Sequence, residues 1–174
     1  NHKIFRATLN ASGQDSSGIE IISNNNGIDG ITIESSNIYS SEGYGIRIKG
    51  GPNVLGKGNA NISSVNVNSQ LANRYALYLE DSESSFIRES NFSTISDTDV
   101  RVSSGSHIFL NTTYIDESVS GQLIRKWYYR SFVNDTEGNF LNNANVTAYN
   151  VSGDYQFNLT TDSTGFTQQT EIID

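Results

Sequence analysis

The sequence contains no cysteine and no methionine, and its 174 residues include a single proline. The lack of cysteine excludes a disulfide framework, a thiol nucleophile and a zinc–thiolate site. Positive charge is also scarce, since 11 Lys and Arg residues stand against 19 Asp and Glu residues and give a net charge of −8. Nucleic acid and anionic membranes would repel such a chain, so neither is expected as a partner.

Long apolar runs are absent as well. No stretch approaches the roughly 18 apolar residues that a membrane-spanning helix needs. The chain opens with NHKIFRATLN, which has neither the basic start nor the apolar centre of a secretory signal. We therefore expect a mature or excised piece of a longer polypeptide, with no membrane span in this segment.

Asparagine, serine, threonine and glycine are abundant, whereas charged residues make up only 17% of the chain. This composition favours strands and turns over helices. Asn-x-Ser/Thr acceptors recur, and such sites are glycosylated in secreted proteins. The pattern predicts an extracellular glycoprotein with candidate glycosylation sites at Asn10, Asn61, Asn91, Asn111, Asn134, Asn145, Asn150 and Asn158.

Short runs of alternating apolar residues return at intervals in the twenties, a period typical of stacked repeats. The lines GITIESSNIYSSEGYGIRIKG from Gly30, ISSVNVNSQLANRYALYLEDS from Ile62 and FIRESNFSTISDTDVRVSSGS from Phe86 can be laid under one another. Two columns then appear. One holds Asn37-Ile38, Asn66-Val67 and Asn91-Phe92, and the other holds Ile46/Ile48, Leu77/Leu79 and Val100/Val102, with GIEII from Gly18 fitting the second.

Strands this short cannot bury their own apolar side chains, so the repeats must stack on one another to build a core. The prediction for residues 1–122 is a right-handed parallel β-helix, with Asn or Gly supplying the positive φ of its corners. The alternative is an antiparallel sandwich, which needs two-residue turns of the Asn-Gly kind. Asn26-Gly27 is the one candidate for such a turn.

Arg47 and Lys49 alternate with Ile46 and Ile48, so an extended strand with inward isoleucines displays both cations outside. They are candidate contacts for an anionic glycan, or alternatively a pair that keeps the strand soluble. Two histidines are present and have no metal-ligand spacing. His107, which begins a repeat, is predicted to lie at the surface.

From Ser16 to about Val67 the chain resembles the polygalacturonase branch of the pectinase-like β-helix superfamily. The resemblance rests on Arg47-Ile48-Lys49 and on the following loop GGPNVLGKG. It implies inverting glycosidase chemistry with separated carboxylates and an assisting histidine. Here Ser17 occupies the histidine position, and Asp15 is the one carboxylate nearby upstream. The likeness therefore implies the fold without the catalytic residues.

The related pectate lyases use a carboxylate cluster that holds calcium. Glu80, Asp81 and Glu83 lie together in LYLEDSES, and hard oxygen ligands in a short loop suit calcium. These three residues are a candidate metal site, and Asp97 and Asp99 recur one repeat later. The alternative is an acidic, solvated corner that discourages edge pairing. No other cofactor is expected.

Aromatic residues concentrate in residues 123–174, where alternating strands are separated by turns at the spacing of an antiparallel sandwich. This part resembles the carboxypeptidase regulatory-like (transthyretin-like) family in Asp135 with Gly138, ANVTAY from Ala144, and Thr161-Asp162 with Gly165. The resemblance implies an incomplete, non-catalytic sandwich module. Trp127 is a candidate glycan contact, or alternatively a core or interface residue.

β-Helices followed by such a module resemble cell-surface proteins of archaea and some bacteria. We expect a secreted, non-enzymatic structural protein of an envelope layer (S-layer), sheath or filament, with copies of itself as partners through β-strand addition. The alternatives are an adhesin that binds cell-surface glycans and a fragment of a lyase or hydrolase acting on uronate-containing glycans.

Overall fold

The computed structural model describes residues 2–23, 30–50, 59–95 and 98–174. Every regular element in these ranges is a β-strand, so the predicted all-β class is confirmed. The chain forms two compact units, one of residues 1–126 with Asp174 and one of residues 127–173. The sequence placed a boundary between 122 and 123. The Asn26-Gly27 turn and the loop from Gly51 to Gly58 lie outside the described residues.

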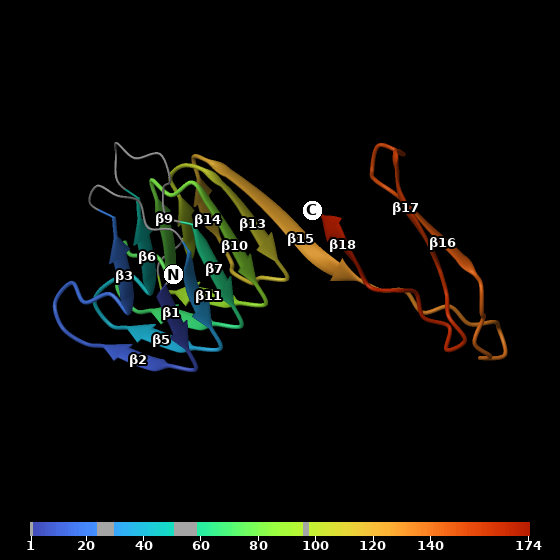
Figure 1. The fold of residues 1–174 in the computed structure, drawn as a ribbon, viewed down its shortest axis with the longest axis horizontal. Helices are drawn as coiled ribbons and strands as arrows, with labels where there is room; N and C mark the ends of the chain where they lie inside the picture. Colours follow the sequence, from blue (N-terminus) through green and yellow to red (C-terminus); the bar gives the residue numbers. More distant parts are fainter. Residues whose placement is uncertain (1, 24–29, 51–58, 96–97) are drawn as a thin grey trace. The chain divides into compact units, whose positions relative to one another are not determined.

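The first unit is a parallel β-solenoid of about four turns, and each complete turn contributes one strand to each of three sheets (Figure 1). Sheet A contains β1 (His2–Phe5), β4 (Ile31–Glu34), β7 (Ala60–Ser63), β10 (Ser84–Arg88), β13 (Ser106–Leu110) and β15 (Gln122–Tyr129). Sheet B contains β2 (Thr8–Ala11), β5 (Asn37–Ser40), β8 (Asn66–Ser69) and β11 (Asn91–Thr94). Sheet C contains β3 (Ile19–Ile22), β6 (Ile46–Lys49), β9 (Leu77–Glu80), β12 (Val100–Val102) and β14 (Glu117–Val119).

The register is the one that the sequence columns predict. Asn37 pairs with Asn66, which pairs with Asn91. In sheet C, Ile46 pairs with Leu77, which pairs with Val100, and the next inward residues follow two positions later. A slip of one residue would turn each apolar side chain outward, so the buried columns hold this register in place.

Aliphatic side chains from the three sheets fill the solenoid. Ile33, Ile62 and Ile87 lie in successive turns of sheet A and are fully buried, as are Leu79 and Val102 in sheet C. Neighbouring parallel strands lie about 4.8 Å apart, so each side chain packs directly on its counterparts above and below. Continuous stacks of this kind let four-residue strands share one core.

The corner between sheets A and B corrects one expectation. Positive φ was predicted to come from Asn or Gly. Asn111 at the last of these corners fits the prediction, but the corner residues of the four preceding turns are Arg6, Ser35, Ser64 and Glu89, with φ between 49° and 53°. An ordinary side chain in this left-handed conformation costs about 1–2 kcal/mol. The residue after the corner offsets part of that cost.

Buried hydroxyls tie the corner of one turn to the next. Ser36 Oγ donates to Glu34 O (2.8 Å) and accepts the N–H of Ala7 (3.1 Å) in the preceding turn. Ser90 repeats both bonds, with Arg88 O (2.7 Å) and the N–H of Val65 (3.3 Å). These bonds give partners to the N–H groups of Ala7 and Val65, and they add a second donor to carbonyl oxygens that already accept the N–H groups of Arg6 and Ser64.

The second unit contains the antiparallel pair β16 (Asn145–Tyr149) and β17 (Tyr155–Thr160), together with β18 (Thr170–Ile173). Isolated antiparallel bridges join Phe132 to Phe166 and Asn134 to Phe140. Asp135 accepts the backbone N–H groups of Glu137 and Asn139, and this fixes the predicted turn. The described residues thus form small antiparallel sheets, which is part of the predicted sandwich.

Candidate functional site

The outer surface of sheet C carries three of the side chains that the sequence singled out, Arg47, Lys49 and Glu80. Ile46 and Ile48 of β6 are fully buried, so Arg47 and Lys49 project outward as predicted. The strand register then sets their neighbours. Glu20 pairs with Arg47, which pairs with Tyr78, and Lys49 pairs with Glu80.

Both cations are bonded to glutamates in adjacent turns. Arg47 donates to Glu80 Oε2 from Nε (3.0 Å) and Nη2 (2.5 Å), and its Nη1 lies 2.7 Å from Glu20 Oε1. Lys49 Nζ lies 2.7 Å from Glu80 Oε1. Only 16% of the Glu80 side chain and 21% of the Arg47 side chain are exposed. The cations are therefore held in a lateral ion-pair network between turns.

The network shifts the ionisation of its central carboxylate. Partial burial of Glu80 opposes its ionisation, but hydrogen bonds from Lys49 and Arg47 and the charges of both outweigh the burial and lower the pKa of Glu80. A carboxylate with a lowered pKa stabilises the fold at pH values above the unfolded-state pKa. That contribution is lost as the pH falls through the folded-state pKa.

Replacement Glu80→Gln is expected to lower the free energy of unfolding at pH 7 by about 1–2 kcal/mol, because two half-buried cations lose their common partner. The difference from the unmodified protein should shrink as the pH falls below about 4.5. Urea unfolding at several pH values measures it. Glu34→Gln is the matched control, since its partner Lys3 is 56% exposed and the pair should contribute less than about 0.5 kcal/mol. Equal effects of the two replacements at pH 7 would contradict this assignment.

A cluster of three tyrosine rings lies beside the ion pairs. The rings of Tyr44, Tyr75 and Tyr78 have centroids 5.4–6.1 Å apart. Guanidinium groups lie over these rings at 5.2–5.8 Å: Arg47 and Arg74 over Tyr44, Arg101 over Tyr75, and Arg47 and Arg101 over Tyr78. Cation–π contacts of this kind bind the turns to one another.

The carboxylates considered for calcium take separate roles. Glu80 faces Arg47 and Lys49, whereas Asp81 sits in a turn with φ of 50° and Glu83 is exposed. Among the residues that the structure describes, no three His, Asp or Glu side chains are grouped closely enough to hold a metal ion. Asp99 is buried and accepts backbone N–H groups from Thr94 and Ile115.

The positions that the polygalacturonase resemblance points to are also on the first unit. Asp15 is exposed, and its carboxylate lies 3.2 Å from Arg74 Nη2. Ser17, at the histidine position of the resemblance, is half-buried. Trp127 belongs to the second unit, where its side chain is half-buried. Of the candidate glycan contacts and metal ligands that the sequence indicated, the structure thus brings together Arg47, Lys49 and Glu80.

All eight candidate glycosylation asparagines are exposed. Several already serve in hydrogen bonds. Asn91 donates to Asn66 (3.0 Å) and accepts from Thr113 (2.8 Å), and Asn150 accepts two backbone N–H groups of its own turn. The sites therefore differ in how free their amides are to carry a sugar.

His107 lies inside the solenoid, so the prediction that it is a surface residue is wrong. Its side chain follows the inward phase of β13, opposite Ser85. Nε2 lies 2.9 Å from Ser104 O, while Nδ1 is buried and has no hydrogen-bond partner among the described residues. Burial lowers the pKa of His107, because an imidazolium there would lose its hydration.

A histidine with a lowered pKa makes the fold sensitive to acid. The unfolded chain binds the proton first, so the contribution of His107 to stability is constant above about pH 6.5 and decreases as the pH falls from there toward the folded-state pKa. We expect His107→Leu to reduce this decrease between pH 6.5 and 5, measured by urea unfolding. His2→Gln should leave it unchanged, since His2 is exposed. An unaltered pH profile in His107→Leu would assign the acid sensitivity to other groups.

Sequence reasoning missed the tyrosine cluster and the role of Glu20. The signal was available in the column alignment, because the residue after each first inward position is Glu20, Arg47, Tyr78 and Arg101 in successive turns. Oppositely charged residues directly across parallel strands stabilise a sheet. Reading the outward columns as well as the inward ones would have predicted the ion pairs.

Comparison with known proteins gives no match: no family model fits the chain, and neither a curated protein nor a solved structure matches it. Among the described residues, no helix is long and apolar enough to cross a membrane.

Proposed function

We propose that this chain is part of a secreted, non-enzymatic structural protein of the cell surface, built into an envelope layer, sheath or filament. The observation that carries the proposal is the lateral network on sheet C. Arg47 and Lys49 form ion pairs with glutamates of adjacent turns. The guanidinium group of Arg101 likewise lies over the ring of Tyr75, which belongs to the preceding turn. Outward side chains that bind one another reinforce a rigid rod.

The distribution of polar groups elsewhere on the solenoid supports the same function. On sheet B, Asn66, Asn91 and Thr113 form a chain of hydrogen bonds that runs across the turns. The exposure of all eight sequon asparagines is what a glycosylated, extracellular protein requires. A wall or sheath protein needs this combination of lateral reinforcement and a hydrated outer surface.

The alternative, a domain that grips or cleaves an anionic glycan, requires cations available to the ligand. A uronate carboxylate would have to displace Glu80 from both Arg47 and Lys49, and these contacts are short and partly buried. The cost of breaking such pairs weighs against this alternative.

Electron microscopy and sedimentation of the purified native protein test the proposal. We expect ordered layers, tubes or filaments in which the solenoid recurs at a regular spacing. Particles that stay monomeric at all salt and calcium concentrations would contradict it. In that case, turnover of polygalacturonate that is abolished by Arg47→Ala would indicate an enzyme, and binding without turnover would indicate an adhesin.

A further inference from the structure

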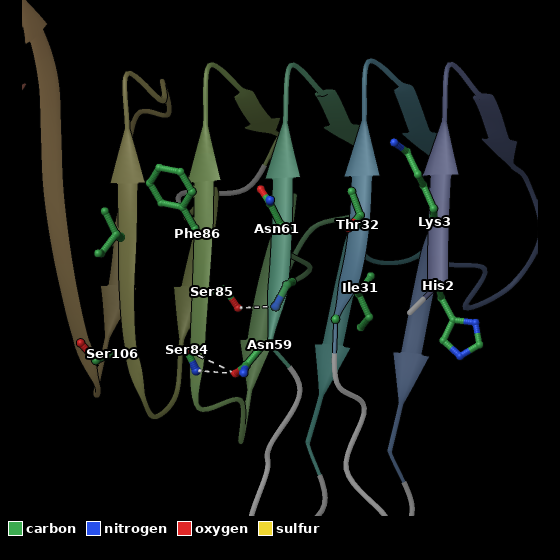
Figure 2. Close-up of a pocket in the computed structure, with 13 residues that line it drawn as sticks. His2, Lys3, Ile31, Thr32, Asn59, Asn61, Ser84, Ser85, Phe86 and Ser106 are labelled. Atoms are coloured by element: carbon green, nitrogen blue, oxygen red, sulfur yellow. Dashed lines mark hydrogen bonds between the residues drawn. The ribbon is translucent and has the colours of Figure 1, made fainter.

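The outer surface of sheet A holds an open hollow of about 640 Å³ that contains one of the sequons (Figure 2). One of the outward rows on this surface has one residue from each strand. In order of turns the row is Lys3, Thr32, Asn61, Phe86, Ile108 and Ile124. The row is polar up to Asn61 and apolar after it.

The apolar part of this row is half-buried, although its side chains point away from the core. Phe86, Ile108 and Ile124 keep intermediate exposure because they cover one another across strands about 4.8 Å apart. Arg88 lies 6.0 Å from the centre of the Phe86 ring. A group that covers these side chains and removes more of their apolar surface from water would stabilise the folded protein.

Asn61 adjoins this apolar row, and its amide is free of the side-chain hydrogen bonds that Asn91, Asn145, Asn150 and Asn158 make. It is exposed, and Figure 2 shows it on the same outward surface as Phe86 of the neighbouring strand. Among the residues that the structure describes, no side-chain hydrogen bond involves Asn61. By contrast, the amide of Asn91 is bonded on both sides.

We propose that Asn61 carries an N-linked glycan whose first sugar lies over Phe86 and covers the apolar part of the row. The inference rests on the proposed secretion of the protein. In the modification, Asn61 Nδ2 attacks C1 of a lipid-pyrophosphate-linked sugar donor. The N–C1 bond forms, the C1–O bond breaks, the lipid pyrophosphate leaves, and the amide proton passes to a base of the host transferase.

The position of the attached sugar follows from the strand geometry. Asn61 stands one strand spacing from Phe86 on one side and from Thr32 on the other, so these are the two cross-strand neighbours on which the first ring can rest. The C–H-rich face of a pyranose packs on an aromatic ring and gains by removing its surface from water. Thr32 offers no comparable apolar area, so the Phe86 side is favoured.

The test uses the protein secreted from cells that N-glycosylate, with peptide mass spectrometry to identify modified asparagines. We expect Asn61 to be occupied in most molecules. Enzymatic removal of the glycans should lower the Tm by about 2–4 °C, which corresponds to about 1 kcal/mol for a chain of this size. This decrease should be absent in Asn61→Gln and in Phe86→Ala, and it should persist in Asn111→Gln, which removes an exposed sequon at a corner.

Two results would overturn the inference. One is an unmodified Asn61 in a protein whose other sequons carry glycans, which leaves the proposed secretion intact. The other is a decrease in Tm that remains unchanged in Phe86→Ala, which would mean that the sugar does not lie on that ring. The assembly seen by electron microscopy is an independent readout, so failure of the structural role would be recognised separately.

Discussion

Replacement of Gly45 by valine is expected to lower the free energy of unfolding by at least about 3 kcal/mol and the Tm by roughly 10 °C. A Cβ at this position would lie 2.2 Å from Val67 Cγ1 and 2.6 Å from the backbone oxygen of Ala76. That oxygen accepts the N–H of Ile46 at 2.8 Å, so it cannot retreat without breaking the ladder between turns. Glycine is needed here because adjacent turns approach closely.

Thermal unfolding followed by circular dichroism measures the effect of Gly45→Val. Glu42→Ala is the control, since Glu42 is exposed in the same turn and its replacement should change the Tm by less than about 2 °C. If Gly45→Val has the same Tm as the control, the adjacent turns at sheet C are not packed closely enough for a side chain at residue 45 to clash with Ala76.

Removal of the Asp99 carboxylate has the second large expected effect. Asp99 is 3% exposed, and its two oxygens accept the N–H groups of Thr94 (2.7 Å) and Ile115 (2.6 Å), which lie in successive turns. Asp99→Ala leaves both donors without this acceptor. Because hydrogen bonds to a charged acceptor contribute about 1.5–3 kcal/mol each, we expect a loss of roughly 3 kcal/mol in the free energy of unfolding.

Two further variants separate this corner role from a general effect of acidic charge. Asp99→Asn keeps one acceptor oxygen and should lose about half as much stability as Asp99→Ala. Glu83→Ala removes an exposed carboxylate nearby in sequence and should change the free energy of unfolding by less than about 0.5 kcal/mol. Urea unfolding at pH 7 provides the comparison. Equal losses in Asp99→Ala and Glu83→Ala would contradict the corner role.

Gly45 and Asp99 belong to one column, since the N–H of Ile19 donates to Gly45 O, that of Ile46 to Ala76 O, and that of Leu77 to Asp99 O. Gly18 and Gly45 fill the column in the first two turns, where the neighbouring backbone lies too close for a Cβ, and Ala76 fills it in the third. In the fourth turn, a carboxylate uses the same corner to cap backbone donors. The repeat is therefore regular in backbone and variable in the chemistry of its corners.

The part of the site that could be predicted was the direction of its side chains. Alternation with Ile46 and Ile48 places Arg47 and Lys49 outside, and the structure shows them there. Their partners were harder to find, because Glu20 and Glu80 lie 27 and 33 residues from Arg47 in the chain. His107 was misjudged because a histidine at the start of a repeat gives no local sign that it shares the inward phase of its strand.

The sequence alone determined the all-β class, the stacking of repeats and the register of the inward columns, because apolar alternation within four-residue strands is a local signal that survives loops of unequal length. Tertiary structure alone decided the contacts that the strand columns do not give. These are the diagonal bond of Arg47 to Glu80 and the contacts of Tyr44 and Tyr75, which lie outside the strands. It also decided that Arg6, Ser35, Ser64 and Glu89 turn the corners, since hydrogen bonds between turns offset a conformational cost that is unfavourable for each residue by itself.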